Sequence, residues 1–147
     1  MELSSFPEVL KRGALKRGAV FRMNMSEEDG ITPKHGDDKQ KRFVVIATDE
    51  GRLAAASLII NSEINRNLFN VIAPYQHEIY RSDYDFLDHD SYIDGFTLHE
   101  FSASRILSEA DFIGVIDETD IQESVNHLVD TGKVKPAILK RYNLQHS

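Results

Sequence analysis

Two His-Glu dipeptides carry the residue types of a zinc-dependent hydrolase: His77-Glu78 and His99-Glu100. In such enzymes a second histidine follows four residues after the first, so that both imidazoles bind the metal from one helix face while the glutamate acts as general base. Arginine and alanine occupy those two positions here. Neither dipeptide can form that zinc site, and we interpret both histidines as structural or surface residues.

Two further segments carry residue types suited to phosphate or metal binding. Residues 30–36 (GITPKHG) have the glycines of a phosphate-binding loop but lack its Gly-Lys-Ser/Thr ending. In an EF-hand register that begins at Asp88, the twelfth residue is His99 instead of a bidentate glutamate. The aspartates of this second segment are Asp83, Asp85, Asp88, Asp90 and Asp94. We interpret them as a solvated acidic loop and expect neither a metal nor a cofactor.

The composition is that of a globular protein, with an uneven distribution of charge. The 147 residues are 41% hydrophobic, and the lack of cysteine excludes disulfides, thiolate zinc sites and cysteine nucleophiles. The net charge is -7, but residues 1–81 contain 12 basic and 11 acidic side chains, whereas residues 82–147 contain 5 and 13. Affinity for a polyanion is therefore expected in the first half. Because no apolar run is typical of a membrane span or a signal peptide, we expect a cytoplasmic protein with no membrane contact.

The hydrophobic pattern predicts several strands and then a helix near the C-terminus. Strands are expected over residues 18–25, 43–48, 52–60, 76–81, 92–101 and 112–116. A short helix is expected over 102–110, and a longer one after Asp117, its N-cap. The longer helix has one apolar face, formed by Ile121, Val125, Leu128 and Val129. This order favours a mainly β fold with peripheral helices (α+β), built as a small antiparallel barrel or sheet.

The chain is expected to form one domain, residues 1–147. We divide it into an N-terminal segment (1–17), a barrel with helices (18–131) and a C-terminal extension (132–147). A polar loop is expected over residues 26–40, and Pro136 is suited to open a last short helix.

Three segments have the order and spacing found in one known family. Residues 17–21 (RGAVF) match an opening Gly-x-[IV]-[VW] strand, and residues 41–47 (KRFVVIA) match an Arg-Pro-x-[VL]-V-[IV]-[ST] strand. Residues 90–94 (DSYID), followed by Arg105-Ile106 and residues 113–116 (IGVI), match a C-terminal strand, helix and strand. With the closing helix that follows, the match covers residues 17–131, and the chain resembles the MazF/PemK-like family of toxin–antitoxin ribonucleases.

The resemblance implies an SH3-like barrel with a C-terminal helix, usually homodimeric, that cleaves single-stranded RNA without a metal. The 2′-OH attacks the adjacent phosphate, which requires a base, an acid and cationic or hydroxyl donors on the phosphate oxygens. The family's catalytic arginine falls on Lys41 and its hydroxyl residue on Ser62. Because lysine lacks the planar donor pair of arginine, Arg42 stays a candidate beside Lys41. Consecutive residues of a pleated strand point to opposite faces, so the two residues share one face only if the chain is not yet pleated at this point.

Other residues in the first half complete the predicted site. His35, on the polar loop, is a candidate general base because an imidazole titrates near neutral pH. RNA-binding candidates contact phosphates through their cations or base edges through their amides; they are Arg22, Lys34, Lys39, Asn61, Asn65 and Asn67. Each of these residues also has a non-functional interpretation. The arginine and lysines can be solvated surface cations, and the asparagines and Ser62 can be turn residues.

Three functions are open on this basis. The first is a toxin-type endoribonuclease, which would be neutralised by a small antitoxin with an acidic tail. The second is a catalytically inactive barrel of the same fold that binds RNA or a protein, favoured by the lysine at the arginine position and by the acidic second half. The third is a structural or interaction protein, for which no salt-dependent RNA binding is expected.

Overall fold

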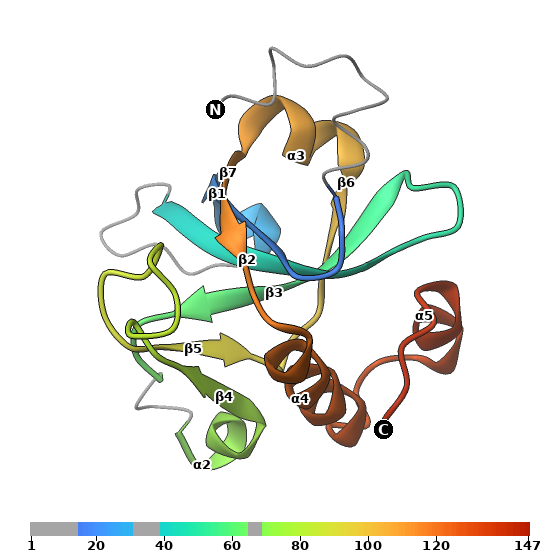
Figure 1. Ribbon diagram of the computed structural model, residues 1–147. Coiled ribbons are helices and arrows are strands. Elements are labelled where there is room, and N and C mark those ends of the chain that lie inside the picture. Colours follow the sequence, from blue (N-terminus) through green and yellow to red (C-terminus); the bar gives the residue numbers. More distant parts are fainter. Residues whose placement is uncertain (1–14, 31–38, 65–68) are drawn as a thin grey trace.

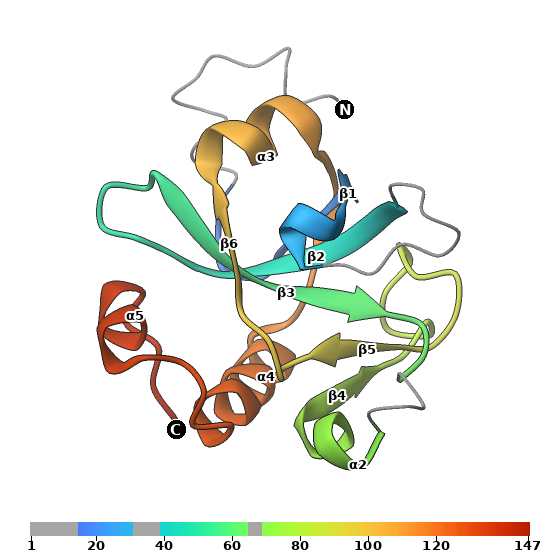
Figure 2. The same ribbon diagram turned by 180° about the vertical axis from the view of Figure 1, so that it is seen from behind.

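An antiparallel sheet with helices on both sides forms the described part of the computed structural model, which covers residues 15–30, 39–64 and 69–147 (Figures 1 and 2). Its seven strands are β1 (Ala19–Met25), β2 (Lys39–Thr48), β3 (Ala54–Asn61), β4 (Gln76–Ile79), β5 (Ser91–Asp94), β6 (His99–Ser102) and β7 (Asp111–Val115). The fold is therefore mainly β with a few helices (α+β), the class expected from the strand pattern.

Four α-helices and two short 3-10 turns complete the described structure. The helices are α2 (Phe69–Ile72), α3 (Ala103–Glu109), α4 (Glu118–Asp130) and α5 (Pro136–Arg141), and the turns are η2 (Glu27–Asp29) and η5 (Ala73–Tyr75). Asp117 stands at the N-cap of α4 and Pro136 opens α5, both as predicted. None of the described helices has the length and apolar character needed to cross a membrane.

The strand order is β4-β5-β3-β2-β1-β7, and β6 pairs with the first half of β3. The long strands β2 and β3 form a hairpin because the Asp49 carboxylate accepts hydrogen bonds from the backbone N–H groups of Leu53 (2.7 Å) and Ala54 (3.2 Å). Arg52 takes the left-handed conformation that this turn needs (φ 55°). The start of β2 and the end of β3 consequently lie on the same side of the molecule (Figure 1).

A closed barrel is not shown, since β4 and β7 end the strand order and, among the described residues, do not pair with each other. Helix α4 follows β7 after two residues and packs against β4. Ile121 of α4 shares the first core with Ile79 of β4 and with the partly buried Ile113 of β7, so the core is buried without hydrogen bonds between the two edge strands. The sheet therefore stays open.

The strand expected over residues 92–101 is divided into β5 and β6. The Asp94 carboxylate accepts a hydrogen bond from the backbone N–H of Phe96 at 2.8 Å, which turns the chain. Gly95 lies against neighbouring segments so closely that a Cβ there would be 2.7 Å from the carbonyl oxygen of Tyr75 and 2.9 Å from Cβ of His127. Packing at Gly95 thus directs β5 and β6 to opposite halves of β3. Strand β2, by contrast, begins four residues before the expected start.

Two hydrophobic cores lie on opposite faces of the sheet, as the alternation along β1 and β2 requires. The first combines Val20 and Val44 with α4 side chains that include Ile121. The second combines Phe21 and Phe43 with side chains of α3. Of the apolar face expected on α4, Val129 is only partly buried. The C-terminal extension joins the first core through Tyr142 and Leu144 and partly buried α5 residues, while the N-terminal segment lies outside the described residues up to position 14.

Candidate functional site

Two residues of the predicted site, the catalytic candidate Lys41 and the RNA-binding candidate Asn61, meet across β2 and β3. Arg42 lies opposite Ile60 in the antiparallel register, which brings Lys41 next to Asn61. The Lys41 Nζ donates a hydrogen bond to Asn61 Oδ1 at 3.0 Å, and both side chains are half-buried. The bond holds the end of a flexible lysine in one place, so its ammonium group has a defined position on this face of the sheet.

The row of polar side chains continues from Asn61 across the next two strands. Asn61 pairs with Tyr92 of β5, and Tyr92 pairs with Glu78 of β4. Residues that lie opposite each other in neighbouring strands project from the same face. We call Lys41, Asn61, Tyr92 and Glu78 the polar row. With adjacent strands about 4.8 Å apart, the row spans about 14 Å from β2 to β4.

Glu78 raises the pKa of two tyrosines near the end of the row, Tyr92 and Tyr80. Its negative charge raises the pKa of Tyr92. Tyr80 donates a hydrogen bond through its hydroxyl to Glu78 Oε1 at 3.0 Å, and this bond raises the pKa of Tyr80. A phenol of ordinary pKa is already neutral at physiological pH, and the raised pKa extends this neutral range toward higher pH. The row presents a cation, an amide, a neutral aromatic hydroxyl and a carboxylate on one face of the sheet, where Glu78 is exposed and the other three side chains are half-buried.

Arg42 projects from the opposite face of β2, toward the side of the first core. Its Nη2 donates to Asp88 Oδ2 at 2.9 Å. Arg22 of β1 lies directly opposite Arg42, and Asp111 approaches its Nη2 at 4.0 Å. The structure thus brings together Arg22 with Arg42, and Lys41 with Asn61, but on two different faces, because the strand is already pleated at these positions.

The other predicted site residues take no part in these contacts within the described structure. Ser62 follows Asn61 and is exposed, and Lys39 opens β2 opposite Met25. Four predicted residues lie outside the described residues: Lys34, His35, Asn65 and Asn67.

The two histidines of the His-Glu dipeptides make hydrogen bonds within the protein. His77 Nε2 lies 2.7 Å from Asp120 Oδ1, and Tyr84 donates through its hydroxyl to the other oxygen of Asp120. His99 Nδ1 lies 3.1 Å from the carbonyl oxygen of Asp29, and burial lowers the pKa of His99. Within the described ranges, no group of three or more histidines and carboxylates could hold a metal ion.

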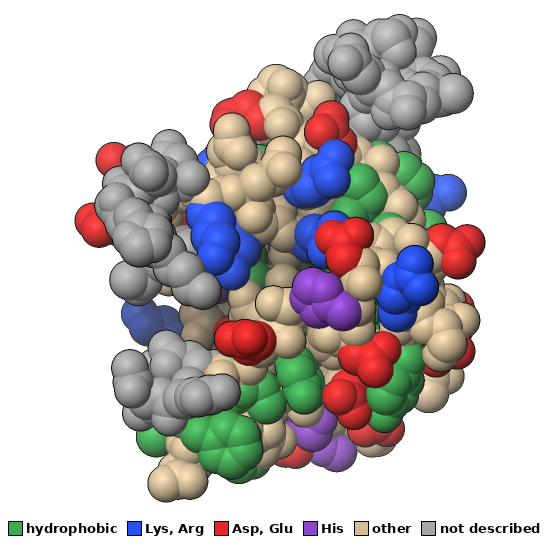
Figure 3. All heavy atoms as spheres, turned by 90° about the vertical axis from the view of Figure 1, so that its left-hand side faces the viewer, with side chains coloured by type: hydrophobic (Ala, Val, Ile, Leu, Met, Phe, Trp, Pro, Cys, Tyr) green, Lys and Arg blue, Asp and Glu red, His purple; other side chains and the backbone are tan. Residues whose placement is uncertain are grey.

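Charges of both signs alternate on the side of the molecule where β2 begins. Figure 3 shows blue Lys and Arg side chains separated by red Asp and Glu side chains on the part of this side that is not grey. Two ion pairs at strand β2 and its neighbour β1 are Arg42 with Asp88 and Arg22 with Asp111. A ligand with alternating charge, or a polyanion that displaces exposed carboxylates, fits this surface better than one that needs a continuous basic patch.

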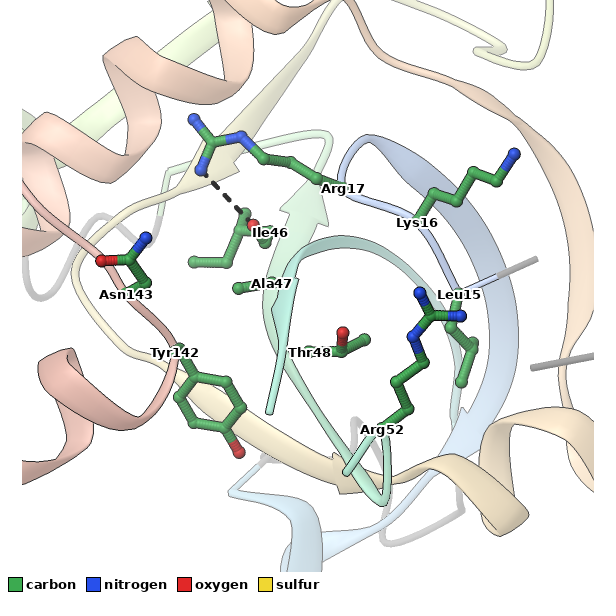
Figure 4. Close-up of a pocket in the computed structure, with 9 residues that line it drawn as sticks. All are labelled: Leu15, Lys16, Arg17, Ile46, Ala47, Thr48, Arg52, Tyr142 and Asn143. Carbon is green, nitrogen blue, oxygen red and sulfur yellow. Dashed lines mark hydrogen bonds between the residues drawn. The ribbon is translucent and has the colours of Figure 1, made fainter. Parts of the chain in front are cut away.

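A pocket of about 440 Å³ lies at the other end of β2 (Figure 4). Its wall consists of residues 15–17, residues 46–48, Arg52 and the segment Tyr142-Asn143. Arg17 forms an ion pair with Glu118, with Nη2 2.7 Å from Oε1. Its Nη1 donates a hydrogen bond to the carbonyl oxygen of Ile46 at 3.4 Å. At roughly 3.3 Å per strand residue the pocket is about 20 Å from Lys41, so it is separate from the polar row.

The sequence pattern did not identify Tyr92 and Glu78 as neighbours of Lys41. Each lies in a predicted strand, and a period of two predicts that Glu78 and Tyr80 share a face. No local signal states that β4 pairs with β5 and β5 with β3. Comparison with known proteins adds nothing here: no family model matches the chain, and no curated protein matches it significantly. The function is therefore inferred from the geometry of the site.

Proposed function

We propose that this protein binds single-stranded RNA along the polar row and cleaves it, without a metal ion, at the Lys41 end. The observation that carries this proposal is the 3.0 Å bond between Lys41 Nζ and Asn61 Oδ1. It fixes a cation where β2 begins and β3 ends, which are the two segments that the resemblance to MazF/PemK-like ribonucleases assigns to catalysis. A cation in a defined position can bind the phosphate oxygens of a phosphodiester and stabilise the negative charge that develops on them during cleavage.

The other side chains of the polar row suit the unpaired bases of RNA. An amide such as Asn61 can bond to a base edge, and the aromatic ring of Tyr92 or of the 45%-exposed Tyr80 can stack on a base. The carboxylate of Glu78 accepts hydrogen bonds from base amino groups or from a ribose 2′-OH. A flat sheet surface about 14 Å across accommodates more than one nucleotide in an extended strand.

In the proposed reaction the ribose 2′-oxygen attacks the adjacent phosphorus, and the bond from phosphorus to the 5′-oxygen breaks. The products are a 2′,3′-cyclic phosphate and a 5′-hydroxyl. Lys41 stabilises the added negative charge on the phosphate oxygens, and the Ser62 hydroxyl donates to the same group. His35 takes the proton of the 2′-OH, and a proton from solvent or from its imidazolium neutralises the leaving oxygen.

We also propose the barrel type of this protein, its dimeric state and its protein partner. An open sheet whose strand β3 is shared by β5 and β6 is compatible with a partly open SH3-like barrel of the PemK type. The resemblance over residues 17–131 further supports a cytoplasmic homodimer neutralised by an antitoxin with an acidic tail.

The test is incubation of the purified protein with a long single-stranded RNA in EDTA. We expect cleavage that leaves 2′,3′-cyclic phosphate ends, a strong reduction in Lys41→Ala, and partial activity in Lys41→Arg, which keeps the charge. Lys140→Ala, which removes an exposed lysine on α5, is the matched control and should cleave normally. If the wild type neither binds nor cleaves RNA, the proposal is wrong.

A second candidate is a barrel that binds RNA or a protein without catalysis. It is favoured by the lysine at the position of the family arginine, since an ammonium group lacks the paired donors that grip two phosphate oxygens. Salt-dependent RNA binding with no cleavage in any variant would select this alternative. Absence of any salt-dependent RNA binding would instead select an interaction protein with no nucleic-acid role.

A further inference from the structure

Arg22 and Arg42 form a pair of like charges directly opposite each other in the sheet. They are register partners on β1 and β2, and both project from the face that carries the first core. Like charges at directly opposite positions of neighbouring strands repel and destabilise the sheet. An arrangement of this kind is stable when an anion lies between or beside the two guanidinium groups.

The carboxylates near this pair neutralise it only weakly. Asp88 accepts a hydrogen bond from Arg42 at 2.9 Å, but its side chain is 73% exposed. Asp111 is 57% exposed, and its oxygen is 4.0 Å from Arg22 Nη2, beyond hydrogen-bond distance. Such exposed ion pairs contribute little to stability, because water screens both charges. Both carboxylates can therefore leave the arginines at low cost.

Each of the two arginines also has one hydrogen-bond donor, its Nε–H, that is shielded from solvent. The Nε atoms of Arg22 and Arg42 are buried, and neither has a hydrogen-bond partner among the described residues. A buried donor without an acceptor is unfavourable. The remaining guanidinium atoms are accessible, since the side chains are 40% and 23% exposed. A tetrahedral oxyanion offers enough acceptor atoms to bond to both planar groups at once.

We propose that Arg22 and Arg42 form a phosphate-binding site, in which Asp88 is a resident carboxylate that the phosphate group displaces. The site lies on the opposite face of β2 from Lys41, and it does not depend on the proposed RNA cleavage. Its ligand is a phosphate monoester or diester, free or as part of a nucleic acid. Displacement of Asp88 would break its hydrogen bond to β2, while Tyr84 and Leu87 keep the acidic segment 83–90 packed in the first core.

The experiment follows the Nε–H signals of the arginines by ¹⁵N NMR while inorganic phosphate is added to the full chain. Variants at each arginine assign the signals. We expect the signals of Arg22 and Arg42 to shift in a saturable way, and Asp88→Asn to bind phosphate about fivefold more tightly, because a competing anion is removed. Asp85→Asn, in the same exposed segment, changes the net charge equally and should bind about as the wild type does.

Short RNAs with and without a 5′-phosphate form two further arms that identify the source of the phosphate group. A larger shift of the two Nε–H signals with the phosphorylated RNA indicates a terminal monoester, and equal shifts with both RNAs indicate an internal diester. The proposal is overturned if phosphate and both RNAs leave the two Nε–H signals unchanged. It is also overturned if Arg22→Lys and Arg42→Lys, folded by circular dichroism, bind phosphate as well as the wild type does. These readouts are independent of Lys41 and of cleavage.

Discussion

Lys41 and Arg42 are neighbours in the chain, yet their charged groups lie on opposite faces of β2. Lys41 is held by Asn61 at 3.0 Å on one face, and Arg42 is held by Asp88 at 2.9 Å on the other. One strand therefore contributes a cation to each of the two anion sites that we propose. A substitution at Lys41 should therefore affect RNA binding and cleavage, whereas a substitution at Arg42 should affect phosphate binding.

Lys41→Ala should weaken RNA binding evenly across sequences. Loss of one phosphate contact lowers the slope of log K against log salt by about 1. If cleavage occurs at this end of the polar row, loss of the cation lowers its rate by about 10²- to 10³-fold. Filter binding at several salt concentrations and a cleavage assay measure the two effects. An unchanged salt slope would exclude Lys41 from the RNA contact.

Asn61→Asp should reduce RNA affinity by about tenfold, because the new carboxylate neutralises Lys41 and repels phosphates. The control is Asn143→Asp, which adds the same charge near the far end of β2 and at a positive φ (53°) that aspartate tolerates. Fluorescence anisotropy with a labelled single-stranded RNA compares the two. Equal loss in both variants would indicate a net-charge effect instead of a local one.

Asp29→Asn should destabilise the protein by about 2 kcal/mol, because it breaks a mostly buried ion pair. Arg105 Nη2 donates to Asp29 Oδ2 at 2.9 Å and so connects α3 to the turn that follows β1. The Asp29 side chain is only 9% exposed. Glu109→Gln, which removes a 3.7 Å contact of the same arginine, should change the free energy of unfolding by less than about 0.5 kcal/mol. Urea unfolding of both variants checks this difference.

Gly114→Ala should destabilise the protein by about 1–3 kcal/mol through overpacking. A Cβ at this position would lie 2.3 Å from Cδ1 of Phe86, so the ring must move. Adding Phe86→Ala to Gly114→Ala should remove most of the strain, and the double-mutant cycle should show a large favourable coupling. Additive effects in thermal unfolding would show that the ring does not resist displacement.

Stability should fall as the pH is lowered from about 7.5 to about 5.5, because histidines with a lowered pKa bind a proton more readily when unfolded. Burial lowers the pKa of His99, and burial and His77 lower that of His127. Their contribution is complete above the unfolded value and is lost as the pH falls through it toward the native value. His99→Gln should flatten this dependence in urea unfolding, whereas the exposed His89→Gln should not.

Local patterns in the sequence were enough to predict β1, β3, the apolar part of β2 and the starts of α4 and α5, but they left open whether the strand already includes Lys41 and Arg42. These features depend on residues close together in the chain: the alternation of a strand, an N-cap or a proline at the first helical turn. The mainly β class followed from the same patterns.

Only the tertiary structure decided which strands are neighbours and hence what surrounds each cation. Tyr92 and Glu78 share a row with Lys41 because β4, β5, β3 and β2 are adjacent, and Arg22 faces Arg42 because β1 pairs with β2. The break at Gly95 and the open edge between β4 and β7 likewise come from packing against α4. Contacts of this kind join residues far apart in the chain, and a local pattern of hydrophobic and polar residues is compatible with many such pairings.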